Sequence, residues 1–190
     1  GFYTWCEDGV EADDVIGTLA WQAEAEGYKV VVASADKDFF QLINPNIFLL
    51  NPNDKSETLW QSEQVIAKTG VPPVQIIDWL SLVGDVVDGI PGVPGVGPKT
   101  AAKLLTEHQT IEQLYANLDQ ISSDKLRGKL TEAAEDVRRN QDLVALKTMA
   151  QWNVPLDELV PSQRNEEALR EYYQRWNFRS RLAALDEFPF

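Results

Sequence analysis

The segment that most constrains the fold is residues 84–100, GDVVDGIPGVPGVGPKT, because it is dense in glycine and proline. It holds five glycines and three prolines, and neither residue type is favoured inside a helix or a central strand. The segment must therefore form turns, with regular elements on either side of it. Two acids, Asp85 and Asp88, precede the prolines. We expect the functional loop here, since exposed loops on a rigid scaffold often carry binding residues.

The stretch before this loop shows helix and strand patterns in turn. Residues 10–25 place apolar side chains at helical spacing, and Gly27 follows as a stop. Residues 28–33 form a short β-branched run that is typical of a buried parallel strand, and residues 47–50 indicate a second strand. Residues 34–42 predict a loop that becomes a short helix. A helix followed by a strand indicates an α/β layer.

From residue 61 onward strand signals nearly vanish. Helical spacing recurs in six stretches, at residues 62–68, 73–83, 99–107, 111–117, 122–139 and 166–175. The predicted fold class is therefore α/β: a partial parallel sheet with flanking helices at residues 1–60, followed by a helical subdomain at residues 61–190.

Composition excludes several classes of protein. The 190 residues are 44% hydrophobic and 25% charged, as in ordinary globular proteins. No apolar run reaches the roughly 18 to 20 residues of a membrane helix, so we expect no membrane partner and take the cytoplasm as the default location. The single Cys6 and the single His108 exclude an internal disulfide and the usual Cys/His zinc site. Because the chain begins with Gly1 and its only methionine is Met149, we interpret it as a fragment.

The net charge of −13 argues, taken alone, against a nucleic-acid partner, because phosphate binding favours Lys and Arg. The position of the acids matters more than their number. Carboxylates gathered around divalent cations are neutralised locally and no longer repel phosphate.

Three acidic motifs carry the chemistry. They supply seven carboxylates, on Glu11, Asp13, Asp14, Asp36, Asp38, Asp85 and Asp88. Spacing places Glu11 and Asp14 on one helix face, Asp36 and Asp38 on one side of an extended loop, and Asp85 and Asp88 on one face of a helical turn. If they converge without Lys or Arg partners, they repel one another unless hard cations hold them, and Mg²⁺ or Mn²⁺ is the natural choice.

Each motif taken alone has a simpler interpretation. The acids at the start of the first helix could serve as caps or interact with the helix dipole. Asp36 and Asp38 could belong to a surface turn, and Asp85 and Asp88 could cap a helix. An EF-hand calcium loop starting at Asp36 is excluded, because Gln41 and Ile47 occupy its glycine and glutamate positions.

Residues 92–101, GVPGVGPKTA, have the form of a helix–hairpin–helix turn. In such a turn small residues let backbone N–H groups approach a DNA phosphate at a helix start. A nucleotide-binding P-loop is disfavoured because Pro98 intervenes before Lys99. A purely structural turn between two helices stays open. Nearby, Lys125, Arg127 and Lys129 could contact phosphate or simply face solvent.

Taken in order, EADDVIGTLA, SADKDFFQL and GDVVDGIPGVPGVGPKTA resemble the 5′-nuclease family, the 5′→3′ exonuclease and flap endonuclease domain of the bacterial DNA polymerase I type. The resemblance covers nearly the whole chain and implies a PIN-like nuclease core. The family's amino-terminal part, with a first strand, further ligands and a basic arch, has no counterpart in these residues. The sequence departs from the family at Gly89 and at Val86-Val87, where relatives carry more polar residues.

The resemblance assigns roles to individual residues. It implies that the seven acids hold two divalent ions, Mg²⁺ or Mn²⁺, and that Asp13, Asp14, Asp85 and Asp88 are catalytic. It implies DNA contacts, with K⁺ bound at the hairpin in relatives, at Gly92, Gly95, Val96, Gly97, Lys99 and Thr100.

The implied activity is metal-dependent 5′→3′ exonuclease and 5′-flap endonuclease cleavage of DNA in replication and repair, with flap or nicked duplex DNA as partner and a polymerase domain as a fused neighbour. One alternative is a catalytically incomplete fragment that grips duplex DNA through its hairpin. Another is a carboxylate-rich RNA nuclease of similar α/β design. The large aromatic residues, Trp21, Trp60, Trp79, Trp152 and Trp176, are interpreted as packing anchors rather than base-stacking platforms.

Overall fold

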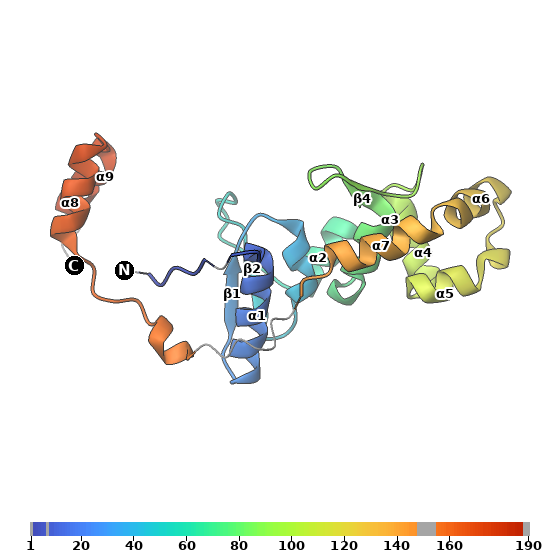
Figure 1. Ribbon diagram of the computed structural model, residues 1–190, viewed down its shortest axis with the longest axis horizontal. Helices are drawn as coiled ribbons and strands as arrows, with labels where there is room; N and C mark the ends of the chain where they lie inside the picture. Colours follow the sequence, from blue (N-terminus) through green and yellow to red (C-terminus); the bar gives the residue numbers. More distant parts are fainter. Residues whose placement is uncertain (1, 7, 148–154, 188–190) are drawn as a thin grey trace. The chain divides into compact units, whose positions relative to one another are not determined.

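The computed structural model describes residues 2–6, 8–147 and 155–187 (Figure 1). The chain divides into two compact units. The larger one is Gly9–Asn153, and the smaller one combines Gly1–Asp8 with Val154–Phe190.

The larger unit begins with the predicted α/β layer. Helix α1 (Ala12–Ala25) packs against strand β1 (Val30–Ala33), and the 3₁₀ helix η1 (Lys37–Leu42) leads to strand β2 (Ile47–Leu50). Strands β1 and β2 are parallel, and the short β3 (Leu59–Trp60) joins β2 antiparallel, so the strand order is β1-β2-β3. The helix and both long strands confirm the sequence predictions, whereas β3 was not predicted because two residues carry no periodicity.

The sheet buries one side of β2. Ile47 and Leu49 are 0% and 2% exposed, as expected for a strand whose alternate side chains face the core. Strand β1 lies at the edge of the described sheet, and its Val31 is 48% exposed.

The rest of the larger unit is mostly helical. Its helices are α2 (Ser62–Thr69), η2 (Pro73–Gln75), α3 (Ile76–Val83), α4 (Pro98–His108), α5 (Ile111–Ala116), η3 (Leu118–Gln120), α6 (Asp124–Glu132) and α7 (Ala134–Val144). Helix α3 is central, because it packs against both α4 and α7. Both ends of α2 have a clear local signal. A Gln61–Gln64 capping box starts the helix, and Gly70, in the left-handed region, ends it.

Two sequence predictions are wrong in this region. Asp85 and Asp88 do not share a helical turn, because β4 (Gly84–Asp85) pairs antiparallel with β5 (Ile90–Pro91) in a short hairpin. Gly84 has φ +80°, a backbone conformation that ends α3 and starts the hairpin. The single helix predicted at residues 122–139 is two helices, α6 and α7, that meet at Ala133.

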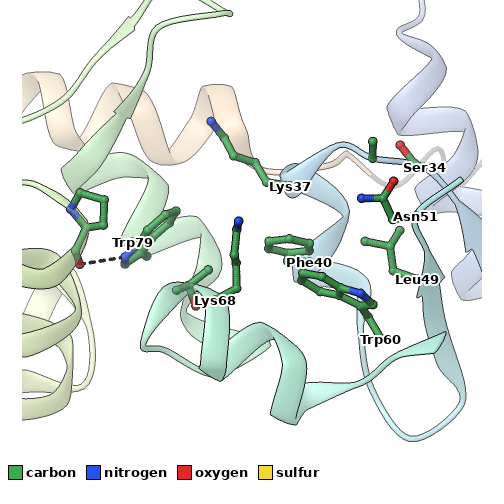
Figure 2. A pocket seen from close by; sticks show the side chains of 11 residues that line it. Ser34, Lys37, Phe40, Leu49, Asn51, Trp60, Lys68 and Trp79 are labelled. Carbon is green, nitrogen blue, oxygen red and sulfur yellow. Dashed lines mark hydrogen bonds between the residues drawn. The ribbon is translucent and has the colours of Figure 1, made fainter. Parts of the chain in front are cut away.

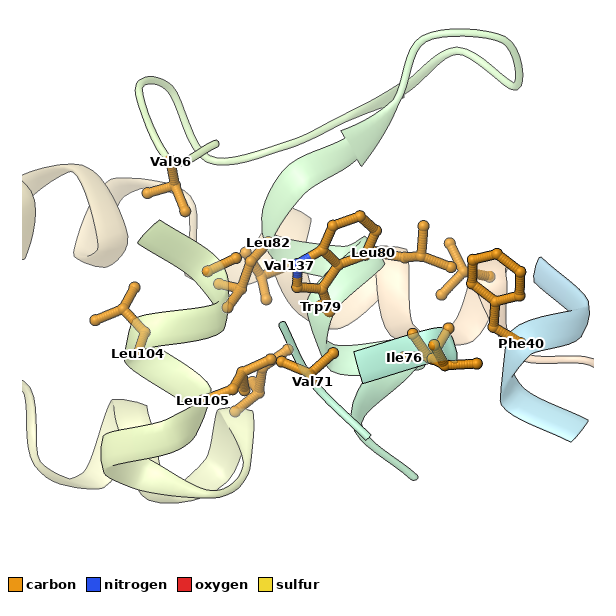
Figure 3. Packing of buried hydrophobic residues seen from close by; sticks show 14 of the residues in the cluster. Phe40, Val71, Ile76, Trp79, Leu80, Leu82, Val96, Leu104, Leu105 and Val137 are labelled. Atoms are coloured by element: carbon orange, nitrogen blue, oxygen red, sulfur yellow. The ribbon is translucent and has the colours of Figure 1, made fainter. Parts of the chain in front are cut away.

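One hydrophobic core runs through the larger unit. Figure 3 shows Phe40 of η1 near Ile76 of α3, and Leu104 and Leu105 of α4 on the other side of α3. The core therefore joins the sheet to the helices, and a division at residue 60 remains a prediction. Within the described residues, no helix is both long and apolar enough to cross a membrane.

The smaller unit contains η4 (Leu156–Leu159), α8 (Glu166–Arg175) and α9 (Arg179–Glu187). The N-cap of α8 is Asn165, whose Oδ1 accepts the Ala168 N–H at 3.0 Å. Helix α8 confirms the sequence prediction, and α9 was not predicted.

The tryptophans have mixed environments. Trp79 is buried, and Trp21 and Trp60 pack against the core of the larger unit, as predicted. Trp176 is 57% exposed, so its prediction as a packing anchor is wrong. Trp152 lies outside the described residues.

Candidate metal centre

Three of the seven predicted carboxylates converge. One oxygen from each of Asp38, Asp85 and Asp88 lies within 4.8 Å of the others. Asp38 stands in the first turn of η1, just beyond the carboxyl end of β1, while Asp85 and Asp88 come from the β4–β5 hairpin. Carboxylate oxygens at this separation suit a hard divalent cation.

Local hydrogen bonds hold these acids in place. Asp36 Oδ1 accepts the Asp38 N–H at 3.0 Å and so caps η1. Asp85 Oδ1 accepts the Val87 N–H at 2.9 Å and tightens the hairpin turn. Asp36 thus caps η1, and the Asp38 side chain faces the other two carboxylates.

Helix α7 holds the β4–β5 hairpin in place through hydrogen bonds. The buried Asn140 amide donates to the Pro91 carbonyl at 2.7 Å and to the Ser81 carbonyl at 3.2 Å. It thereby ties β5 to α3. A residue far along the chain thus fixes the position of Asp85 and Asp88.

The electrostatics of Asp38 favour a bound cation. Burial, followed by the charges of Asp36, Asp85 and Asp88, raises the pKa of Asp38 to about 7. Its Oδ1 atom is buried and has no hydrogen-bond partner within the part of the chain that the structure describes. A buried unpaired oxygen is costly. Burial and then the Asp85 charge likewise raise the pKa of Asp88. These observations fit a divalent cation.

Lys37 supplies a positive charge that the sequence analysis missed. Its Nζ lies 2.6 Å from Asp85 Oδ2, and Asp85 is only 5% exposed. Burial acts to raise the pKa of Asp85, but the Lys37 ammonium and the Val87 N–H outweigh it and lower the pKa below its ordinary value. Asp85 therefore has a lysine partner, and the carboxylate group does not converge without positive charge. The position of Lys37 between Asp36 and Asp38 in the sequence was the available signal that this lysine lies near the acids.

The acids at the start of α1 lie outside the compact group of three. Glu11 occupies the N-cap position, yet its side chain makes no capping hydrogen bond. Asp14 Oδ1 accepts the Lys147 N–H at 2.7 Å. Burial, and then the charge of Asp36, raises the pKa of Asp13. Asp13 therefore shares the electrostatic field of the loop after β1 without joining the Asp38 group.

The predicted DNA-binding loop has tightly packed and open positions. A Cβ at Gly92 would lie 2.1 Å from the Val83 carbonyl oxygen, so this glycine is required by packing within the chain. A Cβ at Gly97 would meet nothing within 4 Å in the described structure. Val96 is 4% exposed, so its side chain belongs to the core and only its backbone can face a ligand.

The loop ends at the start of α4. The N–H groups of Thr100 and Ala101 both donate to the Gly97 carbonyl at 3.0 Å, and Pro98 occupies the first turn. Lys99 is exposed and Thr100 is half-buried. A helix amino terminus with an adjacent exposed lysine is suited to an anion.

One lysine of the following helices reaches this loop. Gly95 has φ +82°, and a Cβ there would lie 2.6 Å from the Lys129 Nζ. Arg127 instead pairs with Asp124 on its own helix and donates to the Ile121 carbonyl. Of these two basic residues, Lys129 is the one that adds positive charge to the hairpin loop.

Two protein-family models match the chain. The model for the 5′-3′ exonuclease N-terminal resolvase-like domain matches residues 1–70, and that for the 5′-3′ exonuclease C-terminal SAM fold matches residues 71–167.

Curated relatives agree with these matches. The chain is 42% identical over 184 residues to DNA polymerase I of Pseudomonas aeruginosa, covering 93% of this chain and 20% of the relative. It is 40% identical over 174 residues to the thermostable DNA polymerase I of Thermus filiformis, covering 92% and 20%. A 5′-3′ exonuclease of Aquifex aeolicus is 35% identical over 179 residues, covering 94% and 60%. The chain thus spans about a fifth of the length of these polymerases.

Solved structures show the same fold. The T5 5′-exonuclease with bound zinc has a TM-score of 0.69 at 24% identity, covering 75% of this chain and 52% of that chain. The catalytic core of Rad2 in complex with a DNA substrate has a TM-score of 0.57 at 17% identity, covering 88% and 57%. At these identities the likeness concerns the fold alone. The predicted α/β nuclease core with a following helical part is confirmed.

Proposed function

We propose that this chain, which belongs to the 5′-3′ exonuclease family, is the nuclease part of an enzyme that cuts DNA in replication and repair. The proposed activity is 5′→3′ exonuclease and structure-specific 5′-flap endonuclease cleavage. The observation that carries the proposal is the convergence of Asp38, Asp85 and Asp88, together with the buried Asp38 Oδ1, which has no hydrogen-bond partner among the described residues. Such a group serves a divalent cation, and phosphodiester hydrolysis is chemistry that divalent cations support.

The proposed cofactors are two ions of Mg²⁺ or Mn²⁺. Asp36, Asp38, Asp85 and Asp88 hold one, some of them through water, and Glu11, Asp13 and Asp14 contribute to the other. When bound, the ions activate water and offset the negative charge of the reacting phosphate. Among the protein's own groups, Asp36 orients Asp38 through its capping bond, and Asp85 and Asp88 are held by the hairpin. We assign the catalytic role to Asp13, Asp14, Asp85 and Asp88.

The hairpin loop is the proposed grip on duplex DNA. Gly95, Gly97 and the backbone of Val96 precede the start of α4, where the positive end of the helix dipole and the Lys99 ammonium suit a phosphate. We include Thr100 as a phosphate contact and K⁺ as an ion held by the carbonyl oxygens of the loop. Gly92 supports the loop through its close approach to Val83. Contacts to backbone phosphates fix position without reading sequence.

We keep the predicted domain division as part of the proposal: residues 1–60 contribute to the nuclease core and residues 61–190 to the DNA-binding part. The partner is 5′-flap or nicked duplex DNA, and a polymerase domain in the same protein is proposed from the relatives named DNA polymerase I. In a bacterium such an enzyme works in the cytoplasm, where the chromosome lies.

A second candidate is a DNA-gripping fragment without turnover. Two observations favour it: Glu11, Asp13 and Asp14 remain outside the compact carboxylate group, and Asp14 is engaged by the Lys147 N–H. In that case the hairpin binds duplex while the acidic site holds ions without cutting.

An end-labelled 5′-flap DNA, incubated with the chain and Mg²⁺ or Mn²⁺, separates the two candidates. The proposed nuclease cuts near the junction, and Asp85→Asn removes cutting while it keeps or tightens DNA binding. Asp119→Asn is the matched control, because Asp119 is exposed and lies outside the site. Binding without cutting would establish the second candidate, and undiminished cutting by Asp85→Asn would refute the assignment of Asp85.

A further inference from the structure

A cavity lies beside the carboxylate group, at the carboxyl ends of two parallel strands (Figure 2). Its volume is about 360 Å³. Ser34, which follows β1, and Asn51, which follows β2, both line it. In open α/β sheets this end of the strands is where ligands bind, and the volume falls in the range of small-ligand pockets.

The charge of the cavity is opposite to that of the chain. Lys37 and Lys68 line it, and none of its described lining residues is acidic, although the chain carries a net charge of −13. Figure 2 shows the Lys68 side chain rising between Trp79 and Phe40. Because the Lys37 ammonium is held by Asp85 at 2.6 Å, the Lys68 ammonium is the charge that favours an anionic ligand such as a phosphate.

The walls are aromatic. Phe40 and Trp60 are stacked, with ring centroids 5.3 Å apart and 19° between their planes. On the opposite wall, the Trp79 indole donates to the Pro98 carbonyl at 3.2 Å, which fixes its orientation. Phe40, Trp60 and Trp79 are anchored in the core and also line the cavity, so the parts of the rings that face it can contact a nucleobase, whatever its identity.

The cavity borders both parts of the proposed site. Lys37 lines it and also pairs with Asp85 of the carboxylate group. Pro98 lines it and also starts α4, where the hairpin loop ends. A DNA strand that runs between the carboxylate group and the hairpin loop therefore passes this opening.

We propose that the cavity binds one unpaired deoxynucleotide of the substrate strand, with its base against the aromatic walls and its phosphate at the Lys68 ammonium. The inference rests on the proposed function and deepens it, because it gives the nuclease a subsite for single-stranded DNA next to its metal centre. The Asn51 amide and the Ser34 hydroxyl offer hydrogen bonds to a base edge or sugar.

The test is a titration followed through the indole N–H signals of the six tryptophans in a ¹⁵N-correlated NMR spectrum. The buffer contains EDTA, so that the result does not depend on bound metal. The probes are thymidine 5′-monophosphate, thymidine and inorganic phosphate, and the variants Trp60→Phe and Trp79→Phe assign the two signals. We expect the nucleotide to shift both signals, and thymidine or phosphate alone to bind much more weakly.

Lysine variants add a second readout. Lys68→Met should raise the dissociation constant of the nucleotide about tenfold, the effect of losing one charge-assisted hydrogen bond. Lys29→Met, which removes an exposed charge just before β1 at the opposite end of the strand, should leave it unchanged. Equal effects of the two variants, unshifted Trp60 and Trp79 signals, or equal binding of phosphate and nucleotide would each overturn the proposal.

The outcome is separable from that of the flap assay. If the chain cuts the flap but its Trp60 and Trp79 signals do not shift with the nucleotide, the subsite is overturned and the nuclease assignment stands. Nucleotide binding by a chain that cuts no flap would keep the subsite and overturn the nuclease assignment.

Discussion

At the scale of single residues, Asp38 carries a charge that the metal-free protein accommodates poorly. Burial and neighbouring acids raise its pKa from 3.8 to about 7. Between these two values the folded chain binds more protons than the unfolded chain, so the free energy of unfolding falls as the pH rises through this window. The stabilising contribution of protonated Asp38 is complete below the unfolded pKa and lost above the folded one.

Asp38→Asn should therefore stabilise the metal-free chain at about pH 8 and have little effect at about pH 4. Because Asp38 is partly exposed, solvent screening limits the gain to about 1 kcal/mol, a rise in melting temperature of roughly 2 to 4 °C. Thermal unfolding in EDTA at both pH values measures it. If Asp38→Asn at about pH 8 melts at the same temperature as the wild-type chain or at a lower one, the environment assigned to Asp38 is contradicted.

Lys37 forms an ion pair with Asp85, and replacing Lys37 should show how much stability the Asp85 carboxylate owes to this pair. In Lys37→Met the nearly buried Asp85 carboxylate loses its ion pair, which costs roughly 1 to 3 kcal/mol in the metal-free chain. Mn²⁺ should restore most of this loss, because a bound cation replaces the ammonium. Urea unfolding with and without Mn²⁺, beside Lys29→Met as control, measures both effects. Equal losses in the two variants, or no recovery with Mn²⁺, would rule out this role.

Sequence reasoning at this scale identified the acids but not the residues that they contact. Spacing shows which acids share an element, and so it predicted Asp38, Asp85 and Asp88 as candidates. It does not show which elements meet, and the Asp14 contact with the Lys147 backbone, 133 residues away in the chain, has no local signal. The orientation of Lys37 depends on the same long-range packing.

At the scale of elements, the loop between β5 and α4 combines a glycine required by packing with one left open. Gly92→Ala places a methyl group against the Val83 carbonyl, a rigid backbone atom, and should cost about 1 to 3 kcal/mol or more. Gly97→Ala has space for its methyl group and an ordinary φ of −94°. Its stability should change by no more than about 0.5 kcal/mol, while its affinity for duplex DNA falls because the methyl group faces the phosphate.

Chemical denaturation and duplex binding by fluorescence anisotropy, at one fixed salt concentration, measure the two glycine variants side by side. Full DNA affinity in Gly97→Ala would show that phosphate does not approach this position.

The elements that the sequence predicted poorly are those set by tertiary contacts. The break between α6 and α7 falls at Ala133, and alanine has the highest helix propensity of all residues. Packing of the buried Leu130 and Val137 on either side of the break overrides propensity. The hairpin of β4 and β5 has only two residues per strand, too few for a periodic pattern.

At the scale of the whole molecule, the net charge bears on the proposed binding to DNA. The net charge is −13, and in the absence of metal the carboxylate group repels phosphate. Asp88→Asn should therefore tighten binding to nicked duplex several-fold in EDTA at low salt, and the gain should shrink as salt screens the repulsion. Anisotropy titrations at two salt concentrations, with Asp119→Asn as control, measure it. A gain that is equal in both variants would point to net charge rather than to the site.

The organisation of the larger unit was predictable only in part. The change from strands to helices near residue 61 was visible in the sequence, because hydrophobic periodicity reports local structure. The continuous core from Ala20 to Val144 was not, since it depends on how α3 packs between the sheet and the other helices.

The central claim is that Asp38, Asp85 and Asp88 form a divalent-cation site. Binding of Mn²⁺, followed by the loss of its free electron paramagnetic resonance signal, tests this claim without requiring catalysis. The wild-type chain should bind Mn²⁺, Asp38→Asn and Asp88→Asn should each bind fewer ions than the wild-type chain, and Glu63→Gln, a change of an exposed acid on α2, should bind as many. Mn²⁺ binding that all three variants share equally with the wild-type chain would contradict the account.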